Sequence, residues 1–430
     1  MAKHNEHIAG QSPKTSKVII AVNTSHGMGY FTDCEGRMLF NKQFEEVRTF
    51  AEGLAHVKQN GKWGFINTKG EEVAPCQYEG AWWFHEGFAQ VDQNGKSGFI
   101  NTNGEEVIPC SYDDTGRFSE GLAPVKQNGK WGFINAKGEV VVPCQYDEVE
   151  EFNEGFSRVV QNGKWHYIKT NGEEVVPCKY DDVGWFHEGF AKVEQNGKIG
   201  YINTMGEEVV PFLYDDGNCF SDGLANVKRN EKWGYVNTKG EEVIPCTYDW
   251  AAGFEEGLAN VKRNEKWGYI NTKGEEVIPC TYGWKGNFSE GLAKVVQNDK
   301  SGYINTKGEI VIPFLYDDGD DFSEGLANVK RNDKWCYINT KGEEVIPCTY
   351  DWAAAFSEDF AKIEQNGKIG YTNTMGEEVV PFQYDDGNYF SDGLAKVKND
   401  EITSIINKEG KVIVAECDYW ETYWSVVEIE

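Results

Sequence analysis

The sequence predicts an all-β protein arranged as an open solenoid or superhelix of twelve repeats, each a three-stranded antiparallel sheet of 34 residues. Two observations predict this fold. One glycine recurs every 34 residues with no insertion, and short apolar runs separated by turn residues fill each interval. The glycine stands at Gly36, Gly70, Gly104, Gly138, Gly172, Gly206, Gly240, Gly274, Gly308, Gly342, Gly376 and Gly410.

A closed, propeller-like ring is the alternative fold. Propeller blades usually have four strands and about 40 or more residues, and rings usually have about four to eight blades. Twelve shorter repeats therefore favour the open form. The chain also begins and ends with apolar runs of the same type, at 18–22 and 425–429, so we expect its two ends to lie in different sheets.

Each repeat is expected to form three strands joined by two turns. In the first full repeat the strands are expected at 54–57, 63–67 and 71–75. The Asn-Gly and Lys-Gly turns between them are typical of hairpins, because glycine adopts positive φ easily. The first turn accepts Glu or Asp in other repeats, so only the second is expected to need glycine's backbone freedom. Pro75 either ends the third strand or lies where no ladder partner is needed.

The first of these strands alternates between constant and variable positions. Ala55 and Val57 change little from repeat to repeat, with Ser157 the one departure from alanine, and are expected in the core. His56 lies between them at a variable position that is expected to face solvent. The next five repeats place Gln90, Pro124, Arg158, Lys192 and Asn226 there.

The repeat also sets the expected boundaries. We expect a disordered tail at 1–16, a degenerate N-terminal capping repeat at 17–50, ten full repeats at 51–390, and a degenerate C-terminal repeat with its cap at 391–430. The tail has no apolar run, and no window of the chain holds 18 consecutive apolar residues. We therefore expect neither a signal peptide nor a membrane span, and a cytoplasmic location.

The repeated phrase resembles a known repeat. Its consensus, GLAxVxxNGKWGYINxxGEEVIPxxYD, is similar to the bacterial WG repeat, also called the KWG repeat, over nearly the whole chain. The resemblance implies an array of short β elements with no established catalytic activity. The namesake tryptophan is replaced by Ser97, Ile199, Ser301 and Ile369. Because serine and isoleucine can replace it, we expect this tryptophan to fill space rather than to contact a ligand in every repeat.

Charge and motifs argue against an enzyme. The 430-residue chain has a net charge of −28, which disfavours nucleic acid and anionic membranes and suits a protein partner with a basic surface. HExxH, GxSxG and phosphate-binding loops are absent from the sequence. Neighbouring acids such as Glu71 and Glu72 point to opposite faces of a strand, which does not suit paired acid–base catalysis. We expect no catalytic residue, no cofactor and no metal.

The cysteines are expected to be buried free thiols. Phe212, Phe314 and Phe382 occupy the same position as cysteine in three of the repeats, and phenylalanine neither binds metal nor forms a crosslink. Unpaired thiols also suit a reducing compartment. The cysteines at this position are Cys76, Cys110, Cys144, Cys178, Cys246, Cys280 and Cys348.

Four residues before the phenylalanine of each repeat form its most variable segment, reading GAWW at 80–83 and WAAG at 250–253. Aromatic side chains among acids there would form a recognition edge, or else would fill gaps against the next repeat. Two functions are therefore considered: a non-enzymatic scaffold that binds another protein through this aromatic and acidic edge, or a carbohydrate or cell-wall binding module. The candidate binding residues are Trp82, Trp83, Trp185, Trp250, Trp284, Trp352 and Tyr389.

Overall fold

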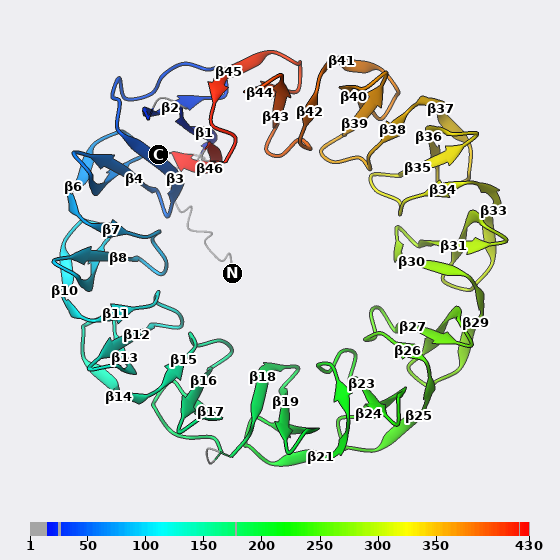
Figure 1. Cartoon of the computed structure of the whole chain (residues 1–430), viewed down its shortest axis with the longest axis horizontal. Coiled ribbons are helices and arrows are strands. Elements are labelled where there is room, and N and C mark those ends of the chain that lie inside the picture. Colours follow the sequence, from blue (N-terminus) through cyan, green and yellow to red (C-terminus); the bar gives the residue numbers. More distant parts are fainter. Residues whose placement is uncertain (1–14, 25–26, 177–178, 421, 430) are drawn as a thin grey trace, which may run out of the picture. The chain divides into compact units, whose positions relative to one another are not determined.

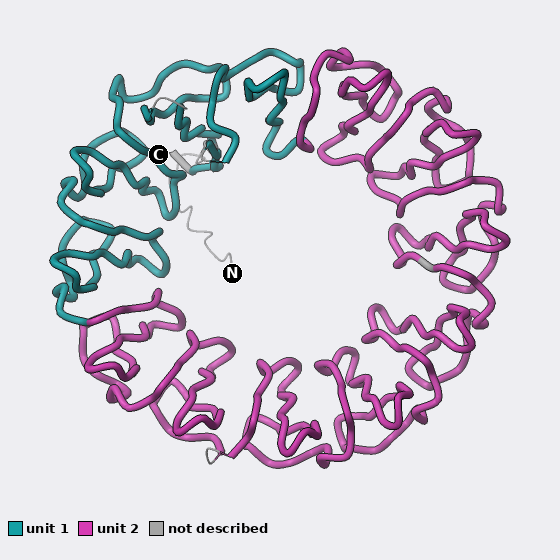
Figure 2. The backbone as a smooth tube through the Cα atoms, in the orientation of Figure 1, with its two compact units in different colours: residues 1–112, 390–430 teal, residues 113–389 magenta. Residues whose placement is uncertain are grey.

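The computed structural model describes residues 15–24, 27–176, 179–420 and 422–429, and every helix or strand element among them is a strand (Figure 1). These ranges contain no helix that could cross a membrane. The chain divides into two compact units (Figure 2). Unit 1 comprises residues 1–112 and 390–430, and unit 2 comprises residues 113–389.

Unit 1 contains strands from both ends of the chain. They are β1 (Thr15–Asn23), β2 (Gly29–Asp33), β3 (Glu46–Ala51), β4 (Leu54–Gln59), β5 (Lys62–Asn67), β6 (Glu72–Tyr78), β7 (Gly80–Ala81), β8 (Phe88–Gln93), β9 (Lys96–Asn101), β10 (Glu106–Tyr112), β43 (Leu394–Asn399), β44 (Ile402–Asn407), β45 (Val412–Cys417) and β46 (Tyr423–Ile429).

Unit 2 repeats one pattern of strands. They are β11 (Asp114–Thr115), β12 (Leu122–Gln127), β13 (Lys130–Asn135), β14 (Val140–Tyr146), β15 (Glu148–Val149), β16 (Phe156–Gln161), β17 (Lys164–Lys169), β18 (Asp182–His187), β19 (Phe190–Gln195), β20 (Lys198–Asn203), β21 (Glu208–Tyr214), β22 (Asp216–Gly217), β23 (Leu224–Arg229), β24 (Lys232–Asn237), β25 (Glu242–Tyr248), β26 (Trp250–Ala251), β27 (Leu258–Arg263), β28 (Lys266–Asn271), β29 (Glu276–Tyr282), β30 (Trp284–Ser289), β31 (Leu292–Gln297), β32 (Lys300–Asn305), β33 (Ile310–Tyr316), β34 (Asp318–Gly319), β35 (Leu326–Arg331), β36 (Lys334–Asn339), β37 (Glu344–Tyr350), β38 (Trp352–Ala353), β39 (Phe360–Gln365), β40 (Lys368–Asn373), β41 (Glu378–Tyr384) and β42 (Asp386–Gly387).

The repeating element is a four-stranded antiparallel sheet whose strands follow chain order, such as β22-β23-β24-β25. The three strands expected in a repeat are confirmed in most repeats, but the prediction of a three-stranded sheet is wrong for them. The sheet β15-β16-β17 is an exception, with three strands among the described residues. The additional strand comes first and lies in the variable segment, and it is often only two residues long, as in β22. So short a strand carries no alternation of apolar and polar residues, which is why the pattern did not reveal it.

The third expected strand is longer than predicted and passes through its proline. Pro75 lies inside β6, which is the edge strand of the sheet β3-β4-β5-β6. Pairing is irregular there, stepping from Phe65 opposite Ala74 to Trp63 opposite Tyr78. A proline fits at this place because an irregular edge does not require its missing N–H.

Both turns of the repeat contain residues with positive φ, so the expectation that only the second needs this conformation is wrong. Glu231, in the first turn of its repeat, has φ 64°. The constant glycine of the second turn has a further reason. A Cβ on Gly104 would lie 2.1 Å from the carbonyl oxygen of Val73 in the preceding sheet. Close packing between sheets, added to the φ of 78°, therefore excludes every other residue there.

The two ends of the described chain share one sheet in unit 1. β1 lies between β2 and β46, with Thr15 opposite Ile429 and Ala21 opposite Tyr423. The prediction that the ends lie in different sheets is therefore wrong, because two strands of the same type pair here in antiparallel orientation. β1 also begins within the tail expected at 1–16, of which residues 1–14 lie outside the described residues.

The contact between the ends resembles the contact between successive sheets. A Cβ on Gly36 would lie 2.5 Å from the carbonyl oxygen of Ile413, just as Gly104 abuts Val73. An open solenoid separates its first and last repeats, so this contact and the β1–β46 pairing contradict it. They match the propeller-like alternative, in which the chain ends meet in one sheet.

Apolar clusters join each sheet of unit 2 to the next. In one cluster, Tyr235 and Ile244 of the β22–β25 sheet pack with Phe254, Val261 and Ile270 of the β26–β29 sheet. Within unit 2 the sheets follow one another along an arc, with fourth strands such as β25 and β29 along its outer side (Figure 1). The first strand is the same edge of each successive sheet, so the variable segments recur at equivalent places along unit 2.

Candidate functional site

An exposed row of aromatic and acidic residues runs along unit 2. Each member is the first residue of the first strand of a sheet, and every one is exposed. We call it the edge row. Its members are Asp114, Glu148, Asp182, Asp216, Trp250, Trp284, Asp318, Trp352 and Asp386.

The pairing of the first strand explains why this position is exposed. Trp250 lies opposite Lys262, and the next residue, Ala251, lies opposite Val261. Side chains alternate along a strand, so Ala251 is buried in the core while the indole of Trp250 points outward. Tryptophan and carboxylate can exchange at this position because the core places no demand on it.

The structure divides the seven predicted binding residues. Trp250, Trp284 and Trp352 belong to the edge row and are 39%, 57% and 37% exposed. Trp185 and Tyr389 occupy the fourth position of the segment, where Trp185 is half-buried and Tyr389 is exposed. Trp82 and Trp83 are exposed, but they belong to unit 1. The tryptophans of the edge row are too exposed to be rings that only fill gaps against the next repeat.

Polar side chains from the neighbouring sheet reach the variable segments, and sequence reasoning missed them. The position of His56 was expected to face solvent, yet Asn226 and Asn328 at this position are fully buried. Asn226 donates its Nδ2 to the carbonyl oxygen of Ala251 at 2.8 Å. The prediction is wrong because the next sheet covers the face that an isolated sheet would expose. The side chains making this contact in unit 2 are Arg158, Lys192, Asn226, Lys294, Asn328 and Lys362.

Two cationic members of this set, Arg158 and Lys362, also lie against aromatic rings. The Nζ of Lys362 is 5.2 Å from the ring centre of Trp352 and 5.8 Å from that of Tyr389. The guanidinium of Arg158 is 4.4 Å from the ring centre of Trp185. Such cation–π contacts hold the rings in place while leaving part of each ring exposed. A single sequence shows no signal for the contacts of Lys362 with Tyr389 and of Arg158 with Trp185, because these partners belong to successive repeats. Lys362 and Trp352, in contrast, lie on neighbouring strands of one sheet.

A tyrosine on the third strand of most sheets fixes the next variable segment. Tyr235 donates its hydroxyl hydrogen to the carbonyl oxygen of Ala252 at 2.7 Å, and Tyr201 donates to Asn218 at 2.6 Å. Burial raises the pKa of Tyr235 well above its usual value, so the phenol stays a donor. These bonds position the backbone that carries the edge row.

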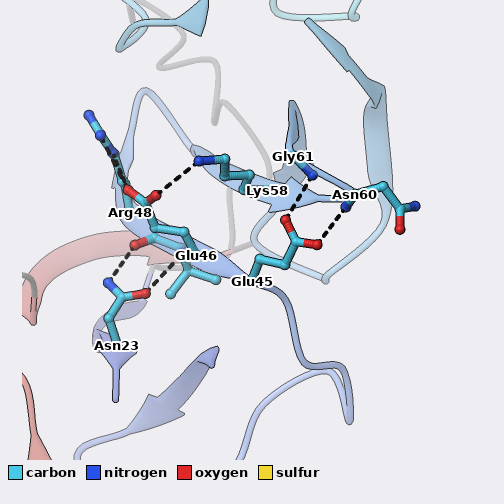
Figure 3. A network of polar contacts seen from close by, with 8 residues as sticks. Asn23, Glu45, Glu46, Arg48, Lys58, Asn60 and Gly61 are labelled. Carbon is cyan, nitrogen blue, oxygen red and sulfur yellow. Dashed lines mark hydrogen bonds and ion pairs between the residues drawn. The ribbon is translucent and has the colours of Figure 1, made fainter. Parts of the chain in front are cut away.

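Trp83 of unit 1 lies in a different setting, beside a cation and a second indole. The ion pairs of that cation belong to the polar network of Figure 3. The guanidinium of Arg48 is 4.8 Å from the ring centre of Trp63 and 5.4 Å from that of Trp83. Arg48 is held by Glu46 at 3.3 Å, and Glu46 also faces Lys58 at 3.7 Å. The charges around Trp83 are therefore paired with one another.

A two-lobed cleft lies beside the edge row in unit 2. One lobe has a volume of about 620 Å³ and the other about 500 Å³, and Trp250 and Asn287 line both. The first lobe also includes Asn260 and Tyr269, and the second includes Trp267 and Trp284. The ring centres of Trp250 and Trp267 are 5.2 Å apart in an edge-to-face arrangement.

Comparison with protein families identifies the repeat. The family described as "WG containing repeat" matches eleven consecutive segments, which cover most of the chain. The chain belongs to the WG containing repeat family. The matched segments are residues 29–63, 63–96, 98–131, 131–165, 167–198, 199–233, 233–267, 267–300, 302–335, 337–368 and 369–401.

The glycine of the WG pair allows close approach of two strands. A Cβ on Gly234 would lie 2.4 Å from the carbonyl oxygen of Ile244 and 2.6 Å from the nitrogen of Cys246. Cys336 takes this position in one WG repeat, and its sulfur is bonded to that of Cys348 in a disulfide. The prediction of a free thiol at Cys348 is therefore wrong, because a side chain at the glycine position must lie against the facing strand. Glu344 lies beside the pair, but the disulfide already uses both sulfurs.

The other cysteines at this position of the WG repeat are half-buried rather than buried. Cys76, Cys110, Cys144, Cys246 and Cys280 are free thiols, and Cys178 lies outside the described residues. Burial is the main cause that raises the pKa of the Cys110 thiol to about 11. In the repeats with phenylalanine, the ring of Phe212 is 6.0 Å from that of Tyr180 in the preceding sheet. The position thus contributes to packing between sheets, as the exchange of cysteine and phenylalanine indicated.

Comparisons beyond the WG repeat family are distant. No curated protein matches the sequence. Among solved structures, a eukaryotic initiation factor is similar with a TM-score of 0.34 and 10% identity, covering 95% of this chain and 98% of its own. The extracellular domain of a one component system from B. thetaiotaomicron has a TM-score of 0.26 and 9% identity, covering 94% and 77%. Likenesses this low carry no argument about fold or function.

Proposed function

We propose that this WG repeat protein is a non-catalytic scaffold that binds another protein along the edge row of unit 2. The observation that carries the proposal is the recurrence of exposed tryptophan and carboxylate at one structural position in successive sheets. A repeated position that the core leaves unconstrained, on one side of the unit, is where a repeat array presents its binding residues.

The chemistry of the row favours a partner with basic side chains. Lysine or arginine can form ion pairs with carboxylates such as Asp318 and can stack on the indole of Trp352. The net charge of −28 adds long-range attraction for such a partner and repels nucleic acid and anionic lipid. Rigid indoles supply contact area with few rotamers to immobilise, and they are common at energetically dominant interface positions.

The proposal is tested by capturing partners from native lysate with three forms of the protein. The row variant carries Trp250→Ala, Trp284→Ala and Trp352→Ala. A control variant carries Leu213→Ala and Leu315→Ala, which remove exposed apolar side chains outside the row. A partner that binds the row is retained by the control, lost by the row variant and released by salt. Equal capture by all three forms contradicts the proposal.

The second candidate function, carbohydrate binding, is favoured by one observation, the two-lobed cleft beside Trp250. Its lining combines indole rings with amide and carboxylate groups.

A further inference from the structure

We propose that the two-lobed cleft on either side of Trp250 binds a neutral oligosaccharide built of pyranose rings. This site goes beyond the protein-binding role of the edge row and does not depend on it. The cleft lies wholly within unit 2. Its lining comes mainly from the sheets that begin with β26 and β30, with Ser221 from the preceding repeat and 319–321 from the following one. Its lobes, at about 620 and 500 Å³, fall in the size range of small-molecule pockets, about 300–1,000 Å³.

The second lobe supplies flat apolar surface beside hydrogen-bonding groups. Trp284 is more than half exposed, and it lines this lobe together with Trp267 and Trp250. Asn287 and Asp321 complete the lining, and a carboxylate oxygen of Asp321 lies against Gly286, where a Cβ would be only 2.4 Å from it. A pyranose ring has an apolar face of C–H groups and a rim of hydroxyls, so it matches indole below and amide or carboxylate at the side.

The first lobe continues the same chemistry on the other side of Trp250. Asn260, Asn287 and Ser221 contribute amide and hydroxyl groups, and Glu255 and Glu256 contribute carboxylates. The Oδ1 of Asn260 is buried and has no hydrogen-bond partner among the described residues. An unsatisfied buried acceptor is costly, so a donor brought by a ligand would be favourable at this wall.

The charges of the cleft favour a neutral ligand over an anionic one. Carboxylates line both lobes, while the cation that lines the second lobe, Lys294, is already used. Its Nζ pairs with Asp318 at 2.8 Å and donates to the carbonyl oxygen of Gly319. An acidic sugar would therefore face like charge without a free counter-charge. Because Trp250 and Asn287 line both lobes, a linear chain of sugars can occupy the two lobes together.

The test is isothermal titration calorimetry of the whole protein with cellohexaose, chitohexaose and maltohexaose, and with a hexamer of galacturonic acid as the anionic comparison. At least one neutral hexamer is expected to bind with a Kd below about 1 mM. Trp284→Ala and Asn287→Ala are each expected to weaken binding at least about 10-fold. Alanine is expected to fit at the position of Asn287, because Ala355 occupies the equivalent position in the repeat of Trp352.

Trp352→Ala is the matched control, because Trp352 holds the same strand position as Trp284 but lies outside the cleft. It is expected to change the Kd by less than about 2-fold, and thermal melts check that each variant is folded. The proposal is overturned if no neutral hexamer binds, if the galacturonate hexamer binds more tightly, or if Trp284→Ala and Trp352→Ala have equal effects. Asn287→Ala leaves the edge row intact, so failure here and failure of the protein-binding role can be told apart.

Discussion

The hydroxyl of Tyr235 donates a hydrogen bond to the carbonyl oxygen of Ala252, 2.7 Å away in the next sheet. In one repeat a different side chain donates to the equivalent carbonyl oxygen. Phe133 replaces the tyrosine there, and the matching carbonyl, that of Glu150, accepts a hydrogen bond from Ser157 at 2.6 Å. Ser157 is the residue that departs from alanine in the first expected strand, and its hydroxyl bonds the carbonyl that corresponds to the acceptor of Tyr235.

Tyr235→Phe is expected to lower the free energy of unfolding by about 1 kcal/mol, because it removes one hydrogen bond and adds no cavity. Ala259 is the residue equivalent to Ser157 in the sheet that follows Tyr235. Adding Ala259→Ser to Tyr235→Phe is expected to recover at least half of the lost free energy of unfolding. Urea unfolding of the two variants measures this. A double variant no more stable than Tyr235→Phe would show that the serine does not replace the phenol.

The same pair predicts a pH dependence. Burial raises the pKa of Tyr235 above the ordinary value of 10.0, so the unfolded chain loses the phenol proton first as the pH rises. The contribution of this group is complete below pH 10 and declines above it. The stability advantage of the native protein over Tyr235→Phe is therefore expected to shrink between neutral pH and pH 11, as followed by denaturant unfolding at each pH.

Replacing Trp250, Trp284 and Trp352 by alanine tests whether the row is exposed in solution. Truncating a buried tryptophan costs about 3–5 kcal/mol, whereas these rings are 37–57% exposed. Each substitution is expected to cost less than about 1.5 kcal/mol, with Trp250 the most sensitive because it contacts Trp267. A loss near the buried value for any of the three, measured by thermal melts of single variants, would mean that the ring fills a gap.

The Cys336–Cys348 disulfide predicts an asymmetry between its two cysteines. Both Cys336→Gly and Cys348→Ser remove the crosslink, which closes a segment with a sequence separation of 12. Cys336→Gly also restores the glycine of the WG repeat, whereas Cys348→Ser leaves a side chain at that crowded position. Cys348→Ser is expected to be less stable than Cys336→Gly by about 1–2 kcal/mol. Peptide mass mapping without reduction verifies the crosslink, and equal stabilities would contradict the steric argument.

Thiol labelling should follow burial and its effect on the pKa. Cys110 is half-buried and its pKa is raised to about 11, whereas Cys219 is exposed. A maleimide reacts with the thiolate, so native Cys110 is expected to react more slowly than Cys219 at pH 7 and to accelerate up to about pH 11. Digestion and mass spectrometry give the rate at each site. Fast labelling of Cys110 at neutral pH would contradict the predicted effect of burial.

Much of the fold could be predicted because the same apolar runs and turns recur from one copy of the repeat to the next, so the pattern stands out from the variation at single positions. The strands around Val57, Phe65 and Ala74 follow from apolar runs and hairpin turns. The predictions that were wrong concern residues and strands whose positions depend on contacts with distant parts of the chain. Asn226 is buried by a neighbouring sheet, and β1 pairs with a strand from the far end of the chain. Neither contact is encoded by local periodicity.

The candidate site was partly predictable for the same reason. The variable segment drew attention to Trp250, Trp284 and Trp352, and their exchange with acids is visible in the sequence. Their partners were not predictable. Lys362 meets Tyr389, and Asn287 joins Trp250 in the lining of the cleft, only after two repeats have stacked, and such distances in the sequence leave no pattern in a single chain.

The pairing of β1 with β46 has a consequence for how the protein reaches its native state. Contacts within a repeat are local and can form early, but the β2-β1-β46 sheet joins residues from opposite ends of the described chain. The entropy cost of closing so long a loop grows only with the logarithm of its length. The chain must nevertheless lose this entropy before the β1–β46 pairing can stabilise it, which slows the step. During synthesis the edge of β1 that pairs with β46 must therefore stay unpaired until β46 has been made, so this sheet cannot be completed before then.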